Sequence, residues 1–207
     1  MAATPEHPAA PSLLPAYFDE VYAAHPDPWG FATRAYEKAK YTRTLAALPR
    51  QHFDQGFEIG CSIGVLSALL APRCKALLSV DVSEVALAQA RLRLAGSPHV
   101  QVQHMAVPNT FPDQALDLVV MSEVGYYWNA HDLARASSHI VDALRPQGVL
   151  LLVHWTPPVA DYPLTGDAVH EHFLALCTPQ GPLRHVAAHR EETYRLDVLE
   201  SNTGRGR

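Results

Sequence analysis

Two glycines and two acids stand at a spacing that suits the binding of a nucleotide-like ligand. Glu58, Gly60 and Gly64 fall within one short run, and Asp81 ends the next apolar run, about twenty residues after Gly60. The pattern predicts a strand, a glycine turn, a helix and a second strand ending on a carboxylate. Backbone N–H groups at such a turn can bind polar ligand groups, and the acid can accept hydrogen bonds from ribose hydroxyls.

The fingerprint of dinucleotide-binding domains is absent at this turn. It needs glycine at the first, third and sixth positions. Counted from Gly60, these positions hold Gly60, Ser62 and Val65. The pattern therefore disfavours a nicotinamide dehydrogenase.

The same residues resemble motif I, and the acid that follows it, in class I S-adenosylmethionine (SAM) methyltransferases. Glu58 stands two residues before the first glycine, the glycines are four apart, and Ser62 replaces the usual middle glycine. The resemblance implies SAM as the cofactor, with Glu58 among the residues that bind it. Gly60, Ser62 and Gly64 would then border its methionine part, and Asp81 would bind the ribose.

Strands and helices alternate through the middle of the chain. Strands are expected at about 54–59, 76–80, 99–105, 116–121 and 149–153, with helices at 64–71, 83–95 and 131–144. Helical crossovers imply parallel strands in an open doubly wound sheet, whose ligand site lies at the carboxyl ends of the strands. Two alternating runs, Leu183 to Arg190 and Thr193 to Glu200, predict an antiparallel hairpin. The fold class is therefore an α/β, Rossmann-like, seven-stranded sheet, mostly parallel and closed by a C-terminal hairpin.

We expect one domain over residues 15–200, between a disordered start (1–14) and a frayed tail (201–207). Within residues 15–50 we expect two aromatic-rich helices that form a lid, in which Trp29 and Tyr36 lie over the cofactor. The alternative is that these rings only pack helices onto the sheet. Residues 51–156 form the SAM-binding core, and 157–200 form a substrate loop, a helix and the hairpin.

Several stretches resemble one branch of the superfamily, the nodulation protein S-like methyltransferases. They are Tyr17 to Tyr22, Asp27 to Phe31, Tyr36 to Lys38 with Tyr41, Glu58 to Cys61, and Ser122 to Tyr127, and the resemblance covers roughly residues 16–155. The named member of that family methylates the free amine on the terminal glucosamine of a deacetylated chitin oligosaccharide. The resemblance implies SAM held between the glycine loop and an N-terminal lid. Ser122 is counted with the cofactor-binding residues.

The adenine part of the site departs from the class pattern. Many class I enzymes carry an aspartate after the third strand, but here the chain reads His104, Met105, Ala106, Val107. Adenine would then depend on backbone groups at Met105 and Ala106 and on apolar contacts such as Val82.

Candidates for the chemistry of methyl transfer follow the fourth and fifth strands. An amine acceptor needs a free lone pair, so an ammonium must first lose a proton to a base. Glu123 follows the fourth strand, His154 ends the fifth, and His170 lies in the helix beyond. We count all three as candidate catalytic residues, each with a structural alternative as a loop, core or surface residue.

Composition excludes few classes of function. The net charge of −5 gives no support for nucleic-acid binding, which usually shows as a basic patch or stripe, although a patch could still form in the fold. No apolar run is long enough to cross a membrane. The three cysteines are widely spaced and the histidines are scattered, so we predict neither a metal site nor disulfides. We expect a cytoplasmic protein that is a monomer or a homodimer. We expect SAM-dependent N-methylation of a small amine such as a deacetylated amino sugar or oligosaccharide. O- or S-methylation of a small metabolite, and a non-enzymatic SAM-binding domain, stay open because one fold serves all of these.

Overall fold

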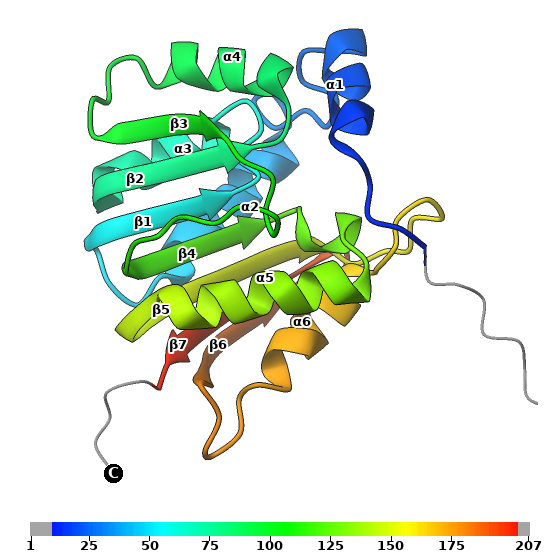
Figure 1. Cartoon of the computed structure of the whole chain (residues 1–207). Coiled ribbons are helices and arrows are strands. Elements are labelled where there is room, and N and C mark those ends of the chain that lie inside the picture. Colours follow the sequence, from blue (N-terminus) through cyan, green and yellow to red (C-terminus); the bar gives the residue numbers. More distant parts are fainter. Residues whose placement is uncertain (1–9, 203–207) are drawn as a thin grey trace, which may run out of the picture.

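The computed structural model describes residues 10–202 as a seven-stranded sheet with helices on both faces (Figure 1). The strand order is β3-β2-β1-β4-β5-β7-β6. The first five strands pair in parallel, and β7 pairs antiparallel with both β5 and β6. This is the predicted sheet, and the fold class is confirmed. Residues 1–9 and 203–207 lie outside the described residues. The predictions of a disordered start (1–14) and a frayed tail (201–207) therefore fall largely outside them as well.

The bounds of the strands agree closely with the sequence pattern, except in β5. The strands are β1 (Phe53–Ile59), β2 (Cys74–Asp81), β3 (Val100–His104), β4 (Leu116–Ser122), β5 (Leu144–Trp155), β6 (Leu183–Arg190) and β7 (Tyr194–Ser201). We expected β5 to begin at Val149, after residues that stop the preceding helix. The strand begins earlier because Leu144 already pairs with Leu116, and the register shift between Leu116 and Leu118 accommodates the intervening residues.

Helices and short 3₁₀ turns fill the connections. They are α1 (Pro15–Ala24), α2 (Ala35–Ala47), α3 (Val65–Leu70), η1 (Ala71–Arg73), α4 (Glu84–Arg93), η2 (Gly125–Tyr127), α5 (Ala130–Ala143) and α6 (Gly166–Leu174). Within residues 10–202, no helix has both the length and the apolar character needed to span a membrane.

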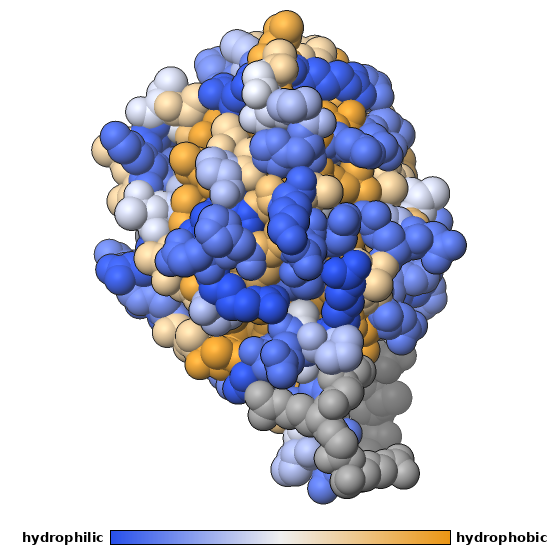
Figure 2. Space-filling view, turned by 90° about the vertical axis from the view of Figure 1, so that its left-hand side faces the viewer, coloured by the Kyte–Doolittle hydropathy of each residue, from blue (hydrophilic) through white to orange (hydrophobic). Residues whose placement is uncertain are grey.

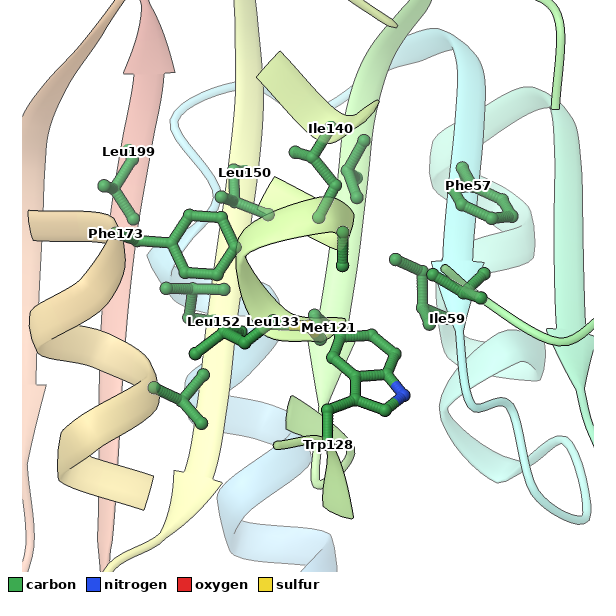
Figure 3. Packing of buried hydrophobic residues seen from close by; sticks show 14 of the residues in the cluster. Phe57, Ile59, Met121, Trp128, Leu133, Ile140, Leu150, Leu152, Phe173 and Leu199 are labelled. Carbon is green, nitrogen blue, oxygen red and sulfur yellow. The ribbon is translucent and has the colours of Figure 1, made fainter. Parts of the chain in front are cut away.

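Alternate residues of the central strands supply two separate cores. On β4, Val119 and Met121 face the cluster under α5 and α6, which also contains Ile140 and Phe173 (Figure 3). Leu118 and Val120 belong to the cluster on the other face, with residues of α2 and α3. This alternation is why β4 reads as a continuous apolar run. A strand buried on both faces holds the loop that follows it firmly in place.

Two ends of the sheet differ in character. The five parallel strands β1–β5 begin at the end seen in Figure 2, where hydrophilic side chains cover most of the surface and apolar residues show between them. At the carboxyl end, α1 and the segment before it lie beside the loops that follow β1, β2 and β4 (Figure 1). The predicted disorder over 10–14 is wrong, since the Leu13 N–H donates to the carbonyl oxygen of Tyr127 (2.9 Å).

Candidate active site

The smaller of two cavities at the carboxyl ends of the strands has a volume of about 210 Å³. The glycine loop forms one wall, and the ends of β2 and β4 form others. Among the residues predicted to bind the cofactor, those that line it are Trp29, Gly60, Ser62, Asp81, Val82, Met105 and Ala106. The structure thus brings together most of the cofactor residues inferred from the sequence.

Left-handed backbone angles shape the glycine loop. Gly60 and Gly64 have φ of +74° and +78°, and Ser62 has +52°. A side chain at Gly60 would overlap Val124, so the loop after β4 can approach the turn only because Gly60 has none. Gly64 has a different role: a Cβ there would lie 3.0 Å from Ala90, so it allows α3 and α4 to pack closely.

Asp81 is tied to the loop by backbone hydrogen bonds. Its Oδ2 accepts from the Ser62 N–H (2.8 Å), and its Oδ1 accepts from the Ser83 N–H (3.0 Å). Burial raises the pKa of Asp81, although these N–H groups act in the opposite direction. The Tyr22 hydroxyl donates to Ser62 Oγ, so α1 also holds the loop. A carboxylate oxygen can accept more than one hydrogen bond, which leaves Asp81 able to bind ribose hydroxyls.

The far end of the smaller cavity suits a flat heterocycle. Met105, Ala106 and Val82 line it as expected, and the polar groups that we had not predicted there are Asn109 and Asp132. Asp132 lies on α5 rather than after β3. Its carboxylate accepts hydrogen bonds from Ser12 Oγ (2.6 Å) and Arg135 Nη1 (3.1 Å), and the local sequence after β3 could not indicate its presence here.

Four predicted cofactor residues do not line the smaller cavity: Tyr36, Glu58, Gly64 and Ser122. Glu58 is buried and accepts hydrogen bonds from the hydroxyls of Ser67 and Ser79. The Tyr36 hydroxyl lies 2.9 Å from Thr193 Oγ1 at the larger cavity. Their direct contact with the cofactor stays a prediction.

The larger cavity has a volume of about 760 Å³ and lies between α2 and the β6–β7 turn. One face of α2 forms a wall, since Tyr36, Lys40 and Arg43 recur at helical spacing. Aromatic side chains dominate the lining: Trp29, Phe31, Tyr36, Tyr126, Tyr127, Trp155, Tyr162 and Tyr194. A polar ring or an organic cation is the kind of ligand that such rings bind.

A buried ion cluster lies in the lining of the larger cavity. Lys40 Nζ lies 2.9 Å from Glu37 Oε2 and 2.7 Å from Glu123 Oε1. Glu123 Oε2 accepts hydrogen bonds from the Tyr126 hydroxyl (2.6 Å) and the Trp155 N–H (2.8 Å). Burial acts to lower the pKa of Lys40, but Glu123 and Glu37 outweigh it and raise that pKa. With Lys40 charged, two carboxylates face one ammonium and the cluster keeps one negative charge.

The two cavities meet at Glu123. Four residues line both: Trp29, Phe31, Glu123 and Tyr127. Glu123 has φ of +59°, and its backbone N–H donates to the carbonyl of Val153 on β5 (2.8 Å). A predicted catalytic residue thus stands where a cofactor in one cavity would face an acceptor in the other.

His154 and His170 line neither cavity. Both are fully buried, and His154 Nδ1 lies 3.1 Å from His170 Nε2. Burial lowers the pKa of His154 well below its ordinary value, so it is neutral. The structure brings these two residues to each other and not to the acceptor, and a direct catalytic role for them stays a prediction.

The sequence reasoning missed Lys40 and Tyr22. Lys40 carried a usable signal, because it follows Tyr36 by four residues and so shares its helix face. Among residues 10–202, no group of three or more His, Cys, Asp or Glu side chains could hold a metal ion.

Comparison with protein families gives one match that covers most of this site. The family model "Nodulation protein S (NodS)" matches residues 19–156. Nodulation protein S of Sinorhizobium fredii is 32% identical over 124 residues, which are 59% of this chain and 57% of that protein. The chain therefore spans somewhat more than half the length of this curated relative.

Two solved structures match over most of the fold. A protein from Pseudomonas syringae described as a methyltransferase is 38% identical, with a TM-score of 0.70 over 81% of this chain and 99% of that one. N-methyltransferase NodS from Bradyrhizobium japonicum, in complex with S-adenosylhomocysteine, is 23% identical. Its TM-score is 0.78 over 90% of this chain and 98% of that one.

Proposed function

Because this chain belongs to the nodulation protein S family, we propose that it transfers the methyl group of SAM to the nitrogen of a small amine. The acceptor that we favour is a deacetylated amino sugar or a short oligosaccharide carrying one. The observation that carries the proposal is the position of Glu123, at the junction of the two cavities and within a buried cluster of net negative charge.

SAM is the cofactor, and we place it in the smaller cavity because Gly60, Ser62 and Asp81 line it. Asp81 would hold the ribose, the turn at Gly60 and Ser62 would border the methionine part, and Met105 and Ala106 would contact adenine. When bound, SAM would supply an activated methyl group for the acceptor nitrogen, which must first lose a proton if it arrives as an ammonium. We assign to the protein the remaining tasks, which are orientation, exclusion of water and handling of that proton.

Electrostatics favours a nitrogen acceptor. The charge left on the cluster attracts an ammonium, and Glu123 can accept a hydrogen bond from the amine that approaches it. Lys40 holds the Glu123 side chain at the junction through a 2.7 Å ion pair, and we assign to this carboxylate the roles of orienting the amine and receiving its proton. Neighbouring rings such as Tyr127 and Trp155 offer faces for a sugar or an organic cation.

The volume of the larger cavity also supports an acceptor larger than a simple amine. At about 760 Å³ it lies in the upper part of the range usual for ligand sites. Its outer charges include Arg34, Arg43 and Glu192, which suit the many hydroxyls of an oligosaccharide. We propose that the amine lies at Glu123 and the rest of the acceptor extends toward the β6–β7 turn.

The first test is calorimetry of SAM and S-adenosylhomocysteine, with NADH as the control. Methyl transfer is then assayed with a fully deacetylated chitin oligosaccharide, against the fully acetylated oligosaccharide as a matched acceptor without the amine. We expect both adenosyl ligands to bind, NADH not to bind, and only the deacetylated sugar to be methylated. Methylation of hydroxyl, carboxylate or thiol acceptors alone would replace this proposal with the O- or S-methyltransferase alternative. Cofactor binding with no turnover on any of these acceptors would favour a non-enzymatic role.

We also propose that the protein acts in the cytoplasm, as a monomer or homodimer. All three cysteines are free thiols in the structure, which is compatible with a reducing compartment. Light scattering on the purified protein would test the oligomeric state.

A further inference from the structure

A row of three buried side chains leads from the closing hairpin to the loop that carries Glu123. His170 Nδ1 lies 2.6 Å from Asp197 Oδ2, and His170 Nε2 lies 3.1 Å from His154 Nδ1. The Gly125 N–H then donates to His154 Nε2 (3.1 Å). Asp197, His170 and His154 each have 0% exposure. We call these three residues the histidine relay.

The last bond of the relay determines where every proton lies. A backbone N–H can only donate, so His154 Nε2 must be unprotonated, and neutral His154 carries its proton on Nδ1. That proton points at His170 Nε2, which must therefore accept, and His170 carries its own proton on Nδ1 toward Asp197. Both histidines are neutral, and one arrangement of protons satisfies all three bonds.

The relay ends on the segment that forms the acceptor side of the site. Gly125 begins η2, which carries Tyr126 and Tyr127, and Tyr126 donates to Glu123. The Tyr126 ring also packs edge-on against His154, with the centroids 5.5 Å apart. The backbone at Gly125 packs closely against α6, because a Cβ there would lie 2.6 Å from Val169. The orientation of this segment therefore depends on the hydrogen bond that Gly125 donates.

We propose that His154 and His170 are positioning residues, which connect the charge of Asp197 to the Gly125 N–H and so hold Glu123 and Tyr126 in place for methyl transfer. A proton added to His170 would occupy Nε2, where His154 already donates. His154 would then have to turn its own proton to Nε2, against the Gly125 N–H. The loop would lose its hydrogen bond, so the acceptor site would loosen in acid.

Other charged or titratable groups surround the relay. Arg195 Nε donates to Asp197 Oδ2 (2.7 Å), and His185 Nε2 lies 2.6 Å from Asp197 Oδ1. The remaining groups that act on it are Lys40 from α2, Tyr126 from η2, Asp167 from α6, and Cys177 after α6. His185 is the histidine among these neighbours of the relay, and a His185→Gln variant separates its contribution from that of the relay.

The first experiment needs neither a variant nor an acceptor. Nitrogen-15 NMR of the whole wild-type chain, saturated with S-adenosylhomocysteine, reports which ring nitrogen of each histidine is protonated. We expect protons on Nδ1 of both His154 and His170, and slow exchange of the Gly125 amide proton at neutral pH. A proton on His154 Nε2, or rapid exchange at Gly125, would overturn the relay.

The second experiment uses Asp197→Asn, with His172→Gln as the matched control. His172 lies on the same helix as His170, but its Nε2 contacts Ser137 on α5, away from both cavities. We expect Asp197→Asn to accelerate exchange at Gly125 about tenfold or more and to leave S-adenosylhomocysteine affinity within about twofold. The control should match wild type in both, and unchanged exchange in Asp197→Asn would contradict the proposal.

The activity arm of this test depends on the proposed function, with a deacetylated chitin oligosaccharide as the acceptor. Loss of the carboxylate lowers the pKa of His170, so the acid limb of the kcat profile should move to lower pH by about one unit. The maximal kcat should fall about tenfold to a hundredfold, with KM little changed. If these residues only stabilised the fold, kcat would fall but the acid limb of its pH profile would not move. That outcome would count against a positioning role for His154 and His170. If wild type turns over no acceptor, the proposed function fails while the NMR result still decides the relay.

Discussion

The cofactor half and the acceptor half of the site each hold a carboxylate at the end of a strand, but they hold it in different ways. Asp81 ends β2, and both of its oxygens accept from backbone N–H groups of the glycine loop and the start of α4. Glu123 follows β4, and its partners are the side chain of Lys40 from α2, the hydroxyl of Tyr126 and a backbone N–H of β5. The cofactor half is therefore built from local backbone, and the acceptor half from side chains that tertiary packing brings together.

This difference has a consequence for tolerance to change. Backbone donors persist whatever side chains the loop carries, provided that the glycines remain. The acceptor half depends on charges that compensate each other in a buried setting, so removal of one leaves the others uncompensated. We therefore expect substitutions in the acceptor half to cost more folding stability than substitutions in the cofactor half.

Lys40→Met should have the largest effect. It leaves Glu37 and Glu123 buried without a cation, so we expect the free energy of unfolding at pH 7.5 to fall by about 3–5 kcal/mol. The loss should shrink at pH 5, because burial already raises the pKa of Glu37 and Lys40 opposes this, so without the cation the Glu37 carboxyl can take up a proton. Urea denaturation at the two pH values measures both effects.

Arg43→Met is the matched control for Lys40→Met. Arg43 lies on the same helix and lines the same cavity but is exposed. Its loss should change stability by less than about 0.5 kcal/mol. Equal effects of the two substitutions would show that the ion cluster does not stabilise the acceptor half.

Glu58→Gln tests a buried acid of the cofactor half that has no cation beside it. Burial raises the pKa of Glu58 to about 7, and hydrogen bonds from Ser67 and Ser79 only partly oppose this. Because the folded-state pKa lies above the unfolded one, the folded protein binds more protons, and stability falls as pH rises from about 4.5 to about 7. This shift corresponds to about 3 kcal/mol, which Glu58→Gln should remove.

Thermal unfolding from pH 5 to 8 measures the effect of Glu58→Gln, with the exposed Glu84→Gln as the control. The difference between Glu58→Gln and wild type should grow in the variant's favour as pH rises. A constant difference across this range would mean that Glu58 stays ionised. The glycine loop would then contain a stabilising charge that the structure does not show.

Much of the cofactor half could be predicted from the sequence, because its contacts are local. Gly60, Ser62 and Asp81 stand at fixed offsets around one strand, turn and helix, and the hydrophobic pattern placed the strands correctly. The error at β5 came from taking Pro146 and Gly148 only as residues that stop the preceding helix, whereas the strand already runs through them past a register shift. Nothing local indicated that Leu13 would bond to η2, since that contact spans more than half of the chain.

The acceptor half could be predicted only in part. Glu123 was found because it directly follows a buried strand. Lys40 was missed because a lysine on a helix is usually exposed, and only the fold shows that two carboxylates enclose it. His154 and His170 were recognised as unusual for their positions, but the sequence could not show that they face each other within the core.

Asp81→Asn should weaken the binding of S-adenosylhomocysteine by about 1.5–3 kcal/mol, the usual cost of losing hydrogen bonds to a charged group. The amide keeps one acceptor oxygen, so part of the loop geometry remains. Calorimetry checks the affinity, and the exposed Asp54→Asn is the control. Wild-type affinity in Asp81→Asn would remove Asp81 from the cofactor site.

Tyr22→Phe should have the smallest effect, and it tests how far the cofactor half depends on side chains. The substitution deletes the hydroxyl that donates to Ser62 Oγ and leaves the ring packed against Trp29. We expect S-adenosylhomocysteine affinity to fall by about 0.5–1.5 kcal/mol, because one neutral hydrogen bond is lost while the backbone donors of the loop stay in place. Tyr17→Phe, on the same helix but partly exposed, should bind like wild type in the same titration. A loss of more than about thirtyfold in Tyr22→Phe, which is about 2 kcal/mol, would mean that α1 holds the loop in its left-handed conformation. The cofactor half would then depend on distant side chains as the acceptor half does.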